Sequence, residues 1–170
     1  MELTTDDQRA VRALATAMLR STAEGDHLTA SRIGGGLVAR FGPGGIADAM
    51  TFWAEEIADH APAAVRDVFG KPQPDKALSP AAAAAAVDRV RRGYGESAAL
   101  GVPVPADPEM PAPTSLYGTL ARFLNAVQRH DRDGKTAAIR ELEDAPQVGF
   151  DVLRELLLAM ASECSPLARS

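Results

Sequence analysis

Residues Gly45–Pro62, GIADAMTFWAEEIADHAP, contain the clearest amphipathic pattern in the N-terminal half of the chain. Apolar residues recur there at the spacing that one face of an α-helix presents to a core. They are Ile46, Ala49, Met50, Trp53 and Ile57. A weaker version of the same pattern returns at Gly149–Pro166, GFDVLRELLLAMASECSP. We therefore expect each half of the chain to close with an amphipathic helix.

The two segments align without a gap, and the alignment extends to the helices expected before them. The matched pairs are Gly45/Gly149, Ile46/Phe150, Phe52/Leu156, Trp53/Leu157, Asp59/Glu163 and Pro62/Pro166, preceded by Leu14/Leu120, Ala15/Ala121, Met18/Leu124, Asp26/Asp133 and Ala30/Ala137. Shifts in register fall only at expected turns, where insertions are tolerated. Repeated helical units bury a shared core, so the pattern indicates a duplication. Because the identities are few, a chance result of helical patterning is the alternative.

Composition favours an all-α fold. The chain has 170 residues, which is enough for one domain or for two small halves that share a core. Hydrophobic residues make up 46% and aromatic residues only 5%, and alanine dominates. Alanine is the best helix former, whereas sheets favour β-branched and aromatic residues.

Charge and cysteine content narrow the classes of partner. The formal net charge of −5 argues against general binding to nucleic acid or to an anionic membrane. The one candidate basic cluster, Arg89, Arg91 and Arg92, is expected in the last turn of a helix, where cations complement the helix dipole. A single cysteine, Cys164, excludes an internal disulfide and fits a reducing cytoplasm. The acidic start, MELTTDDQ, is unlike a signal peptide, and no apolar run is long enough for a membrane span.

Caps and breakers place the helices of the first half. Thr4 and Asp7 resemble a capping pair for a helix over about residues 6–23. Gly25-Asp26 should end this helix, and Asp26 or Thr29 should cap a second one over about residues 28–41. The run Gly42-Pro43-Gly44-Gly45 then breaks the chain before the third helix.

The middle and the second half follow similar signals. Ser79-Pro80 is a typical helix opening, and we expect that Ala-rich helix to end at Gly93 or Gly95. Five prolines predict an extended linker over residues 101–113. A helix over about residues 115–130, a turn at Asp133-Gly134 and a short helix over about residues 136–142 precede the closing helix, about residues 149–164.

These elements predict a helical bundle or short α-solenoid. We expect one compact domain built from two tandem three-helix units, residues 1–62 and 114–170. Residues 63–113 would connect the units through the Ala-rich helix and the Pro-rich linker.

Two motifs that suggest chemistry have simpler explanations. Gly34-Gly35-Gly36 lacks the preceding strand and the following lysine of a phosphate-binding loop, so close helix packing is expected instead. Glu56 and His60 lie one helical turn apart, beside Glu55 and Asp59, and could share a ligand. The chain has only three histidines, in separate segments, and a carboxylate-bridged metal site needs a different spacing. A solvated acidic face is the favoured interpretation, with no metal or cofactor.

Two hypotheses for function follow. The first is a non-enzymatic adaptor or regulatory domain that binds another protein, or a second copy of itself, through its helical faces. The acidic residues Glu55, Glu56 and Asp59 are the expected contact surface. The second is a small-ligand-binding protein or an enzyme with a pocket between the two units. Its candidate lining residues are Trp53, Glu56, His60, Tyr94, Tyr117 and Arg122.

Overall fold

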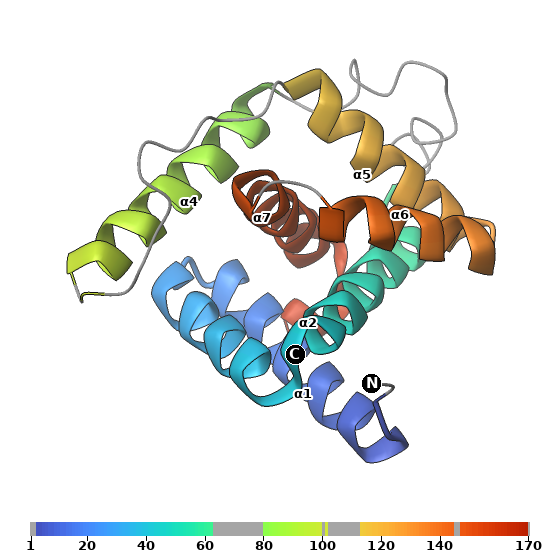
Figure 1. Cartoon of the computed structure of the whole chain (residues 1–170), viewed down its shortest axis with the longest axis horizontal. Coiled ribbons are helices and arrows are strands. Elements are labelled where there is room, and N and C mark those ends of the chain that lie inside the picture. The colour runs from blue at the N-terminus through green and yellow to red at the C-terminus, as the bar shows by residue number, and fades with distance from the viewer. Residues whose placement is uncertain (1–2, 63–79, 100, 102–112, 145–146, 170) are drawn as a thin grey trace. The chain divides into compact units, whose positions relative to one another are not determined.

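The computed structural model describes residues 3–62, 80–99, 101, 113–144 and 147–169, and within these ranges it contains helices and no strand. The helices are α1 (Thr5–Ala23), α2 (His27–His60), α4 (Pro80–Ala99), α5 (Pro113–Gln128), α6 (Arg132–Asp144) and α7 (Gln147–Cys164), followed by the 3-10 helix η2 (Pro166–Ala168) (Figure 1). The predicted all-α class is confirmed. Residues 63–79 and, within the predicted Pro-rich linker, residues 102–112 lie outside the described residues, and Pro113, the predicted end of the linker, is the first residue of α5.

The chain divides into two compact units. Unit 1 contains residues 1–66 and 157–170, and unit 2 contains residues 67–156. The boundary falls within α7, so the C-terminal end of that helix and η2 belong with α1 and α2. This division differs from two consecutive three-helix units, and the tandem arrangement stays a prediction.

The first helix begins as its sequence predicts. Thr4 and Asp7 form a reciprocal capping box, because the Thr4 hydroxyl accepts from the Asp7 N–H at 3.1 Å and the Asp7 carboxylate accepts from the Thr4 N–H. The Asp7 carboxylate also accepts from the Thr4 hydroxyl at 2.8 Å, and this bond, followed by the one from the Thr4 N–H, lowers the Asp7 pKa, to which the nearby Arg40 guanidinium adds. Arg40 of α2 therefore lies near the N-terminal end of α1.

The second and third predicted helices are two arms of α2. They meet at Gly42, whose φ of 67° and ψ of −162° are not helical, and Pro43 follows directly. Glycine adopts this conformation without the clash that a Cβ would cause. The predicted break is thus confirmed as a kink, which we use to divide α2 into a first arm (residues 27–41) and a second arm (residues 43–60).

The core of unit 1 lies where α1 packs on α2. The five apolar residues that predicted the third helix are all buried, as are Val11, Ala15, Met18 and Leu19 of α1. Gly34 faces Met18, whose Cε would lie 3.0 Å from an added Cβ. Together with Arg40 near Asp7, this contact shows that α1 and the first arm of α2 run antiparallel.

The turn between α5 and α6 differs from its prediction. Asp133 and Gly134 lie inside α6, and the turn consists of Arg129, His130, which has φ 54°, and Asp131. The Asp131 carboxylate accepts from the Gly134 N–H at 3.0 Å and caps the helix. A Cβ at Gly134 would lie 2.5 Å from that carboxylate, so glycine permits the cap. The predicted pairing of Asp26 with Asp133 is wrong for this reason.

The corrected turn matches the turn between α1 and α2. Gly25 and His130 both have positive φ, and each precedes a capping aspartate, Asp26 or Asp131. Each aspartate N–H donates to the carbonyl five residues earlier, at 2.9 Å in both turns. A shift of 105 residues therefore relates the two turns. This register also pairs Ala15, Met18 and Leu19 with Leu120, Phe123 and Leu124, all of which are buried.

The Ala-rich helix is longer than predicted. Gly93 and Gly95 do not end α4, which continues to Ala99. The cluster Arg89, Arg91 and Arg92 is consequently in the interior of the helix and not in its last turn. Arg91 and Arg92 are exposed, whereas Arg89 is partly buried.

Candidate functional site

Trp53 belongs to the core of unit 1. Its side chain is fully buried, and its indole Nε1 donates to the backbone oxygen of Ala15 at 3.2 Å. The hydrogen bond joins the second arm of α2 to α1 and satisfies a polar group that burial would otherwise leave without a partner. A ring in this position stabilises the fold and presents no surface to a ligand.

Glu56 and His60 meet as the sequence predicts, and Ser165 joins them. The Ser165 hydroxyl donates to Glu56 Oε2 at 2.6 Å and accepts from the Leu167 N–H at 3.2 Å. His60 Nε2 lies 3.7 Å from the same Glu56 oxygen. In a nucleophilic triad the imidazole lies between the hydroxyl and the carboxylate. Here the carboxylate is in the middle, so the three residues connect α2 to η2 and do not have the arrangement of that triad.

The remaining groups at this end of unit 1 are also engaged or unreactive. Glu55 Oε2 lies 3.5 Å from Arg12, whose guanidinium also covers the Phe52 ring at 5.6 Å. Burial is the main cause of a raised Cys164 pKa, with the carboxylates of Glu56 and Glu163 adding to it, so the thiol stays protonated at neutral pH. Of the predicted acidic contact surface, Asp59 is the exposed member.

Tyr94 belongs to a network that fastens α4 to the first part of α7 in unit 2. Its hydroxyl donates to Asp151 Oδ2 at 2.6 Å, and Asp151 is buried. Arg154 lies 3.5 Å from Asp151 and 3.9 Å from Glu155, which in turn accepts from Arg89 Nε at 3.2 Å. Burial and then the Asp151 hydrogen bond raise the Tyr94 pKa far above its usual range. The charges balance within the network, which is typical of a structural role.

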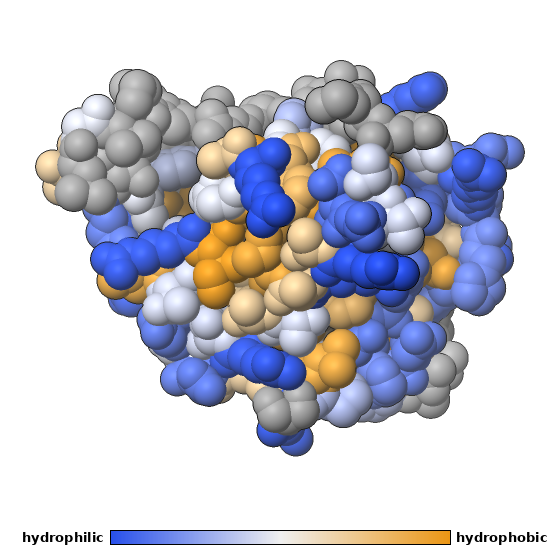
Figure 2. Space-filling model, turned by 90° about the horizontal axis from the view of Figure 1, so that it is seen from below, coloured by the Kyte–Doolittle hydropathy of each residue, from blue (hydrophilic) through white to orange (hydrophobic). Residues whose placement is uncertain are grey.

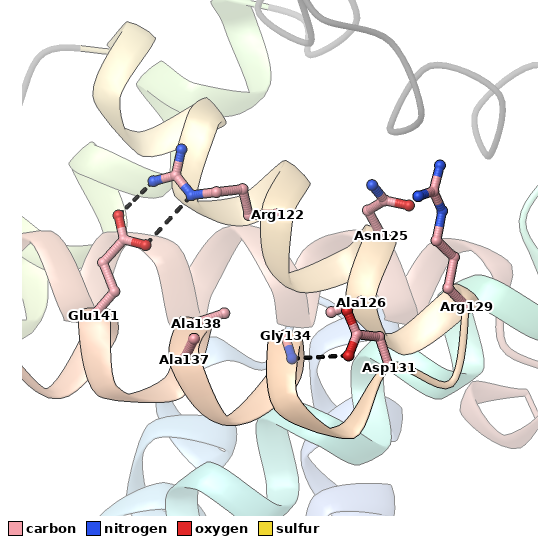
Figure 3. Close-up of a pocket in the computed structure, with 9 residues that line it drawn as sticks. All are labelled: Arg122, Asn125, Ala126, Arg129, Asp131, Gly134, Ala137, Ala138 and Glu141. Atoms are coloured by element: carbon pink, nitrogen blue, oxygen red, sulfur yellow. Dashed lines mark hydrogen bonds and ion pairs between the residues drawn. The ribbon is translucent and has the colours of Figure 1, made fainter.

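Arg122 pairs with Glu141 across α5 and α6. The Nε atom lies 3.3 Å from Glu141 Oε2, the Nη2 atom also donates to Oε1, and Thr119 bonds to the same carboxylate. This two-point pairing is the geometry in which a guanidinium binds a carboxylate best. It closes one end of a hollow of about 280 Å³ between the helices (Figure 3).

The hollow has a small-residue floor and donors along one side. Ala126, Gly134, Ala137 and Ala138 form the floor. Asn125 and Arg129 follow Arg122 along the same side of α5, and Figure 3 shows them next to each other. The carboxylate of Asp131 also lines the hollow, so its polar rim contains both donors and acceptors around an apolar floor. Of the predicted ligand-binding residues, the hollow contains Arg122, whereas Tyr117 lies on α5 in a stretch whose side chains are not described.

The second candidate site is the exposed face of the first arm of α2, which we call the α1–α2 surface. The residues that define it are Leu28, Arg32, Gly35, Gly36, Val38 and Arg40. Leu28 and Val38 are the exposed large apolar side chains within the described part of the chain, at 48% and 42%. Leu28, Arg32, Gly35 and Val38 follow one another at helical spacing and form one stripe. Figure 2 shows a face of the molecule on which apolar residues gather between strongly hydrophilic ones.

The glycine triplet contributes to this surface. Gly34 is buried against Met18, so close packing within unit 1 accounts for a glycine at this position. Gly35 and Gly36 are exposed, and an added Cβ would meet nothing within 4 Å. A glycine inside a helix costs about 1 kcal/mol relative to alanine. No contact in the described structure explains that cost at Gly35 and Gly36.

Comparisons with known proteins add no assignment. No protein-family model matches the chain, and no curated protein or solved structure was found to match it. Within the described residues, no three His, Cys, Asp or Glu side chains gather as a metal site, and no helix is long and apolar enough to cross a membrane.

Proposed function

We propose that the chain is a helical protein-interaction domain and that the α1–α2 surface is its contact surface. The observation that carries the proposal is the stripe of α2 on which exposed Leu28 and Val38 flank open glycines. Large exposed apolar side chains on one face of a helix can serve as anchors for the apolar side chains of a partner. An amphipathic partner helix can place its apolar face on such a helix surface.

The proposal moves the contact surface away from the one that the sequence suggested. Glu55 and Glu56 are engaged with Arg12 and Ser165, so their charge is partly used within unit 1. Charges at the rim of an interface mainly influence association rates, while buried apolar anchors contribute most of the affinity. Val38 is therefore a better anchor than the acidic cluster.

We further propose a duplicated architecture with two three-helix units, residues 1–62 and 114–170, in a cytoplasmic protein. The equal geometry of the Asp26 and Asp131 turns supports the duplication. The two units would then have diverged at their outer faces, since the open glycines occur in the first unit. The single Cys164 supports a reducing compartment.

The test compares variants of one exposed residue on each of two helices. The full chain, Val38→Asp and Ala85→Asp are used to capture partners from the native host. Val38→Asp should lose a captured protein that the wild type and Ala85→Asp retain, because a charge would be buried in the apolar contact. Equal capture by all three would reject the α1–α2 surface as the contact surface.

A second candidate function is supported by the hollow between α5 and α6. Its volume, its Asn125 and Arg129 donors and its Asp131 carboxylate suit a small polar ligand. Mass spectrometry of the native, desalted protein tests this candidate. A bound small molecule that is lost in Arg129→Ala would favour ligand binding over the interaction domain, and an empty protein would leave the interaction domain as the better account.

A further inference from the structure

We propose that the partner of the α1–α2 surface is an amphipathic helix with acidic flanks. The inference rests on the proposed function and adds the chemistry of the partner. Three features carry it: the charge of the first arm of α2, the spacing of its exposed residues, and the open space at Gly35 and Gly36.

The first arm of α2 is cationic within an acidic protein. Residues 27–47 contain Arg32 and Arg40 and no aspartate or glutamate, although the whole chain has a net charge of −5. In α1, by contrast, acidic residues offset the arginines, and Arg9 pairs with Asp6. Complementary potentials guide specific association, so the first arm of α2 favours an acidic partner.

Both arginines of this arm are placed to meet that partner. Arg32 and Arg40 are exposed, and within the described residues each lies near one carboxylate, Asp26 or Asp7, without a hydrogen bond or a close ion pair to it. The guanidinium of Arg40 lies over the Phe41 ring, 4.8 Å from its centroid. Stacking holds the guanidinium and leaves its N–H edge free for a carboxylate. The nearest acids, Asp7 and Asp26, accept hydrogen bonds from Thr4 and Thr29 as helix caps.

The spacing of the stripe defines the length of the partner. Leu28 and Val38 are ten residues apart, which is about 15 Å along a helix axis. A partner helix of about three turns covers this length, with apolar residues at i, i+3, i+4 and i+7. Arg32 and Arg40 are separated by about 12 Å, so carboxylates two turns apart on the partner would reach both.

The glycines allow such a helix to approach closely. The distance between packed helices depends on the side chains at the contact, and it is shortest where these are small. Gly35 and Gly36 lie between the two exposed apolar residues and have open space in front of them. A backbone seated there would gain contacts that the free chain lacks, which accounts for two glycines that weaken an exposed helix.

Other occupants fit less well. A symmetric contact between two copies would place Arg32 and Arg40 against the same arginines, and like charges oppose it. An anionic membrane would suit the charge, but surface-bound helices insert a continuous row of large apolar side chains. Gly35 and Gly36 interrupt that row here.

The experiment titrates the full chain with labelled synthetic helices. One peptide has leucines at i, i+3, i+4 and i+7 and glutamates elsewhere, and a second has lysines in place of the glutamates. Fluorescence anisotropy should show binding of the glutamate peptide alone, weakening as salt rises from about 50 to about 300 mM because screening increases. The double variant Arg32→Glu, Arg40→Glu should bind at least tenfold more weakly. The matched control Arg91→Glu, Arg92→Glu, on exposed positions of α4, should bind as the wild type does.

Several results would overturn the inference. Equal binding of both peptides, no binding of either, or equal losses in the two double variants would exclude an acidic partner helix. Vesicles of phosphatidylglycerol form another arm, and binding to them that is lost only in the Arg32→Glu, Arg40→Glu variant would assign the surface to a membrane. Circular dichroism confirms that each variant is folded. If the native partner still depends on Val38 while the glutamate peptide fails, the proposed function stands and the acidic-helix inference falls.

Discussion

Replacing Gly35 and Gly36 with alanine should stabilise the free protein and weaken its partner binding. Both positions are inside α2, and an added Cβ meets nothing within 4 Å. Each substitution should therefore gain the helix propensity of alanine, about 1 kcal/mol, which gives about 2 kcal/mol for the double variant. In a protein of this size, that gain corresponds to an increase in Tm of roughly 4–8 °C.

Gly34→Ala is the matched control for this prediction. The substitution gains the same helix propensity, but its Cβ would lie 3.0 Å from Met18 Cε. The flexible end of Met18 must move inside a packed core, and such overpacking costs about 1–3 kcal/mol. We expect Gly34→Ala to be neutral or destabilising, whereas alanine at Gly35 and Gly36 should raise the free energy of unfolding.

The assay is urea unfolding followed by tryptophan fluorescence. Trp53 is the one tryptophan of the chain and is fully buried in unit 1, so its emission reports on the unit that contains the glycines. A midpoint that does not rise in Gly35→Ala, Gly36→Ala would refute the open space seen around these residues. A rise in stability with unchanged binding of the glutamate peptide would instead refute their role in the interface. Gains in stability with losses in binding are expected where a strained or weak element serves recognition.

Three further predictions concern the core and the titratable groups. Trp53→Ala should cost about 3–5 kcal/mol in urea unfolding, and Trp53→Phe less, because the ring is fully buried. The Tyr94 pKa is raised mainly by burial, so the protonated tyrosine stabilises the fold fully below about pH 10, and this stabilisation is lost as pH rises through the folded-state pKa. Urea unfolding followed by circular dichroism should therefore show a lower free energy of unfolding at pH 11 than at pH 9, and Tyr94→Phe should lack this decrease. Burial also raises the Cys164 pKa, so its reaction with a disulfide reagent at about pH 8 should be slower than that of a free thiol and should accelerate in urea. A rate equal to that of free cysteine would contradict its burial.

Helices and caps followed from the sequence because their causes are local. The i, i+3, i+4 pattern around Trp53 predicted a buried face, and that face is buried. Thr4 predicted the N-cap of α1, with Asp7 three residues later as its partner. Gly42-Pro43 predicted a break between two helices, which is the kink in α2. Each of these signals depends on residues within one or two helical turns.

The α5–α6 turn was predicted at the wrong residues because two signals competed. Asp-Gly is a strong turn signal, and it directed the prediction to Asp133-Gly134. In the structure the missing Cβ at Gly134 leaves room for the Asp131 carboxylate that caps α6. His130 adopts a positive φ, as Gly25 does in the first turn. A non-glycine residue in that conformation is uncommon, so the sequence offers little warning of it.

The site residues that sequence analysis missed depend on contacts far apart in the chain. Ser165 bonds to Glu56 across 109 positions, and Tyr94 bonds to Asp151 across 57. No periodic pattern encodes such pairs. The Ser165-Pro166 dipeptide does resemble the Ser79-Pro80 helix opening, and it could have predicted the cap of η2.

Photo-crosslinking from the α1–α2 surface tests the central claim most directly. A photoreactive residue replaces Val38 in the full chain, and a control chain has it at Ala85 on α4, which is also exposed. Both chains are irradiated in the native host. We expect one defined protein adduct from position 38 that is absent from position 85, with the crosslink mapping to an amphipathic segment rich in Asp and Glu. Adducts that are the same from both positions, or none from position 38, would contradict a protein-interaction function for this surface.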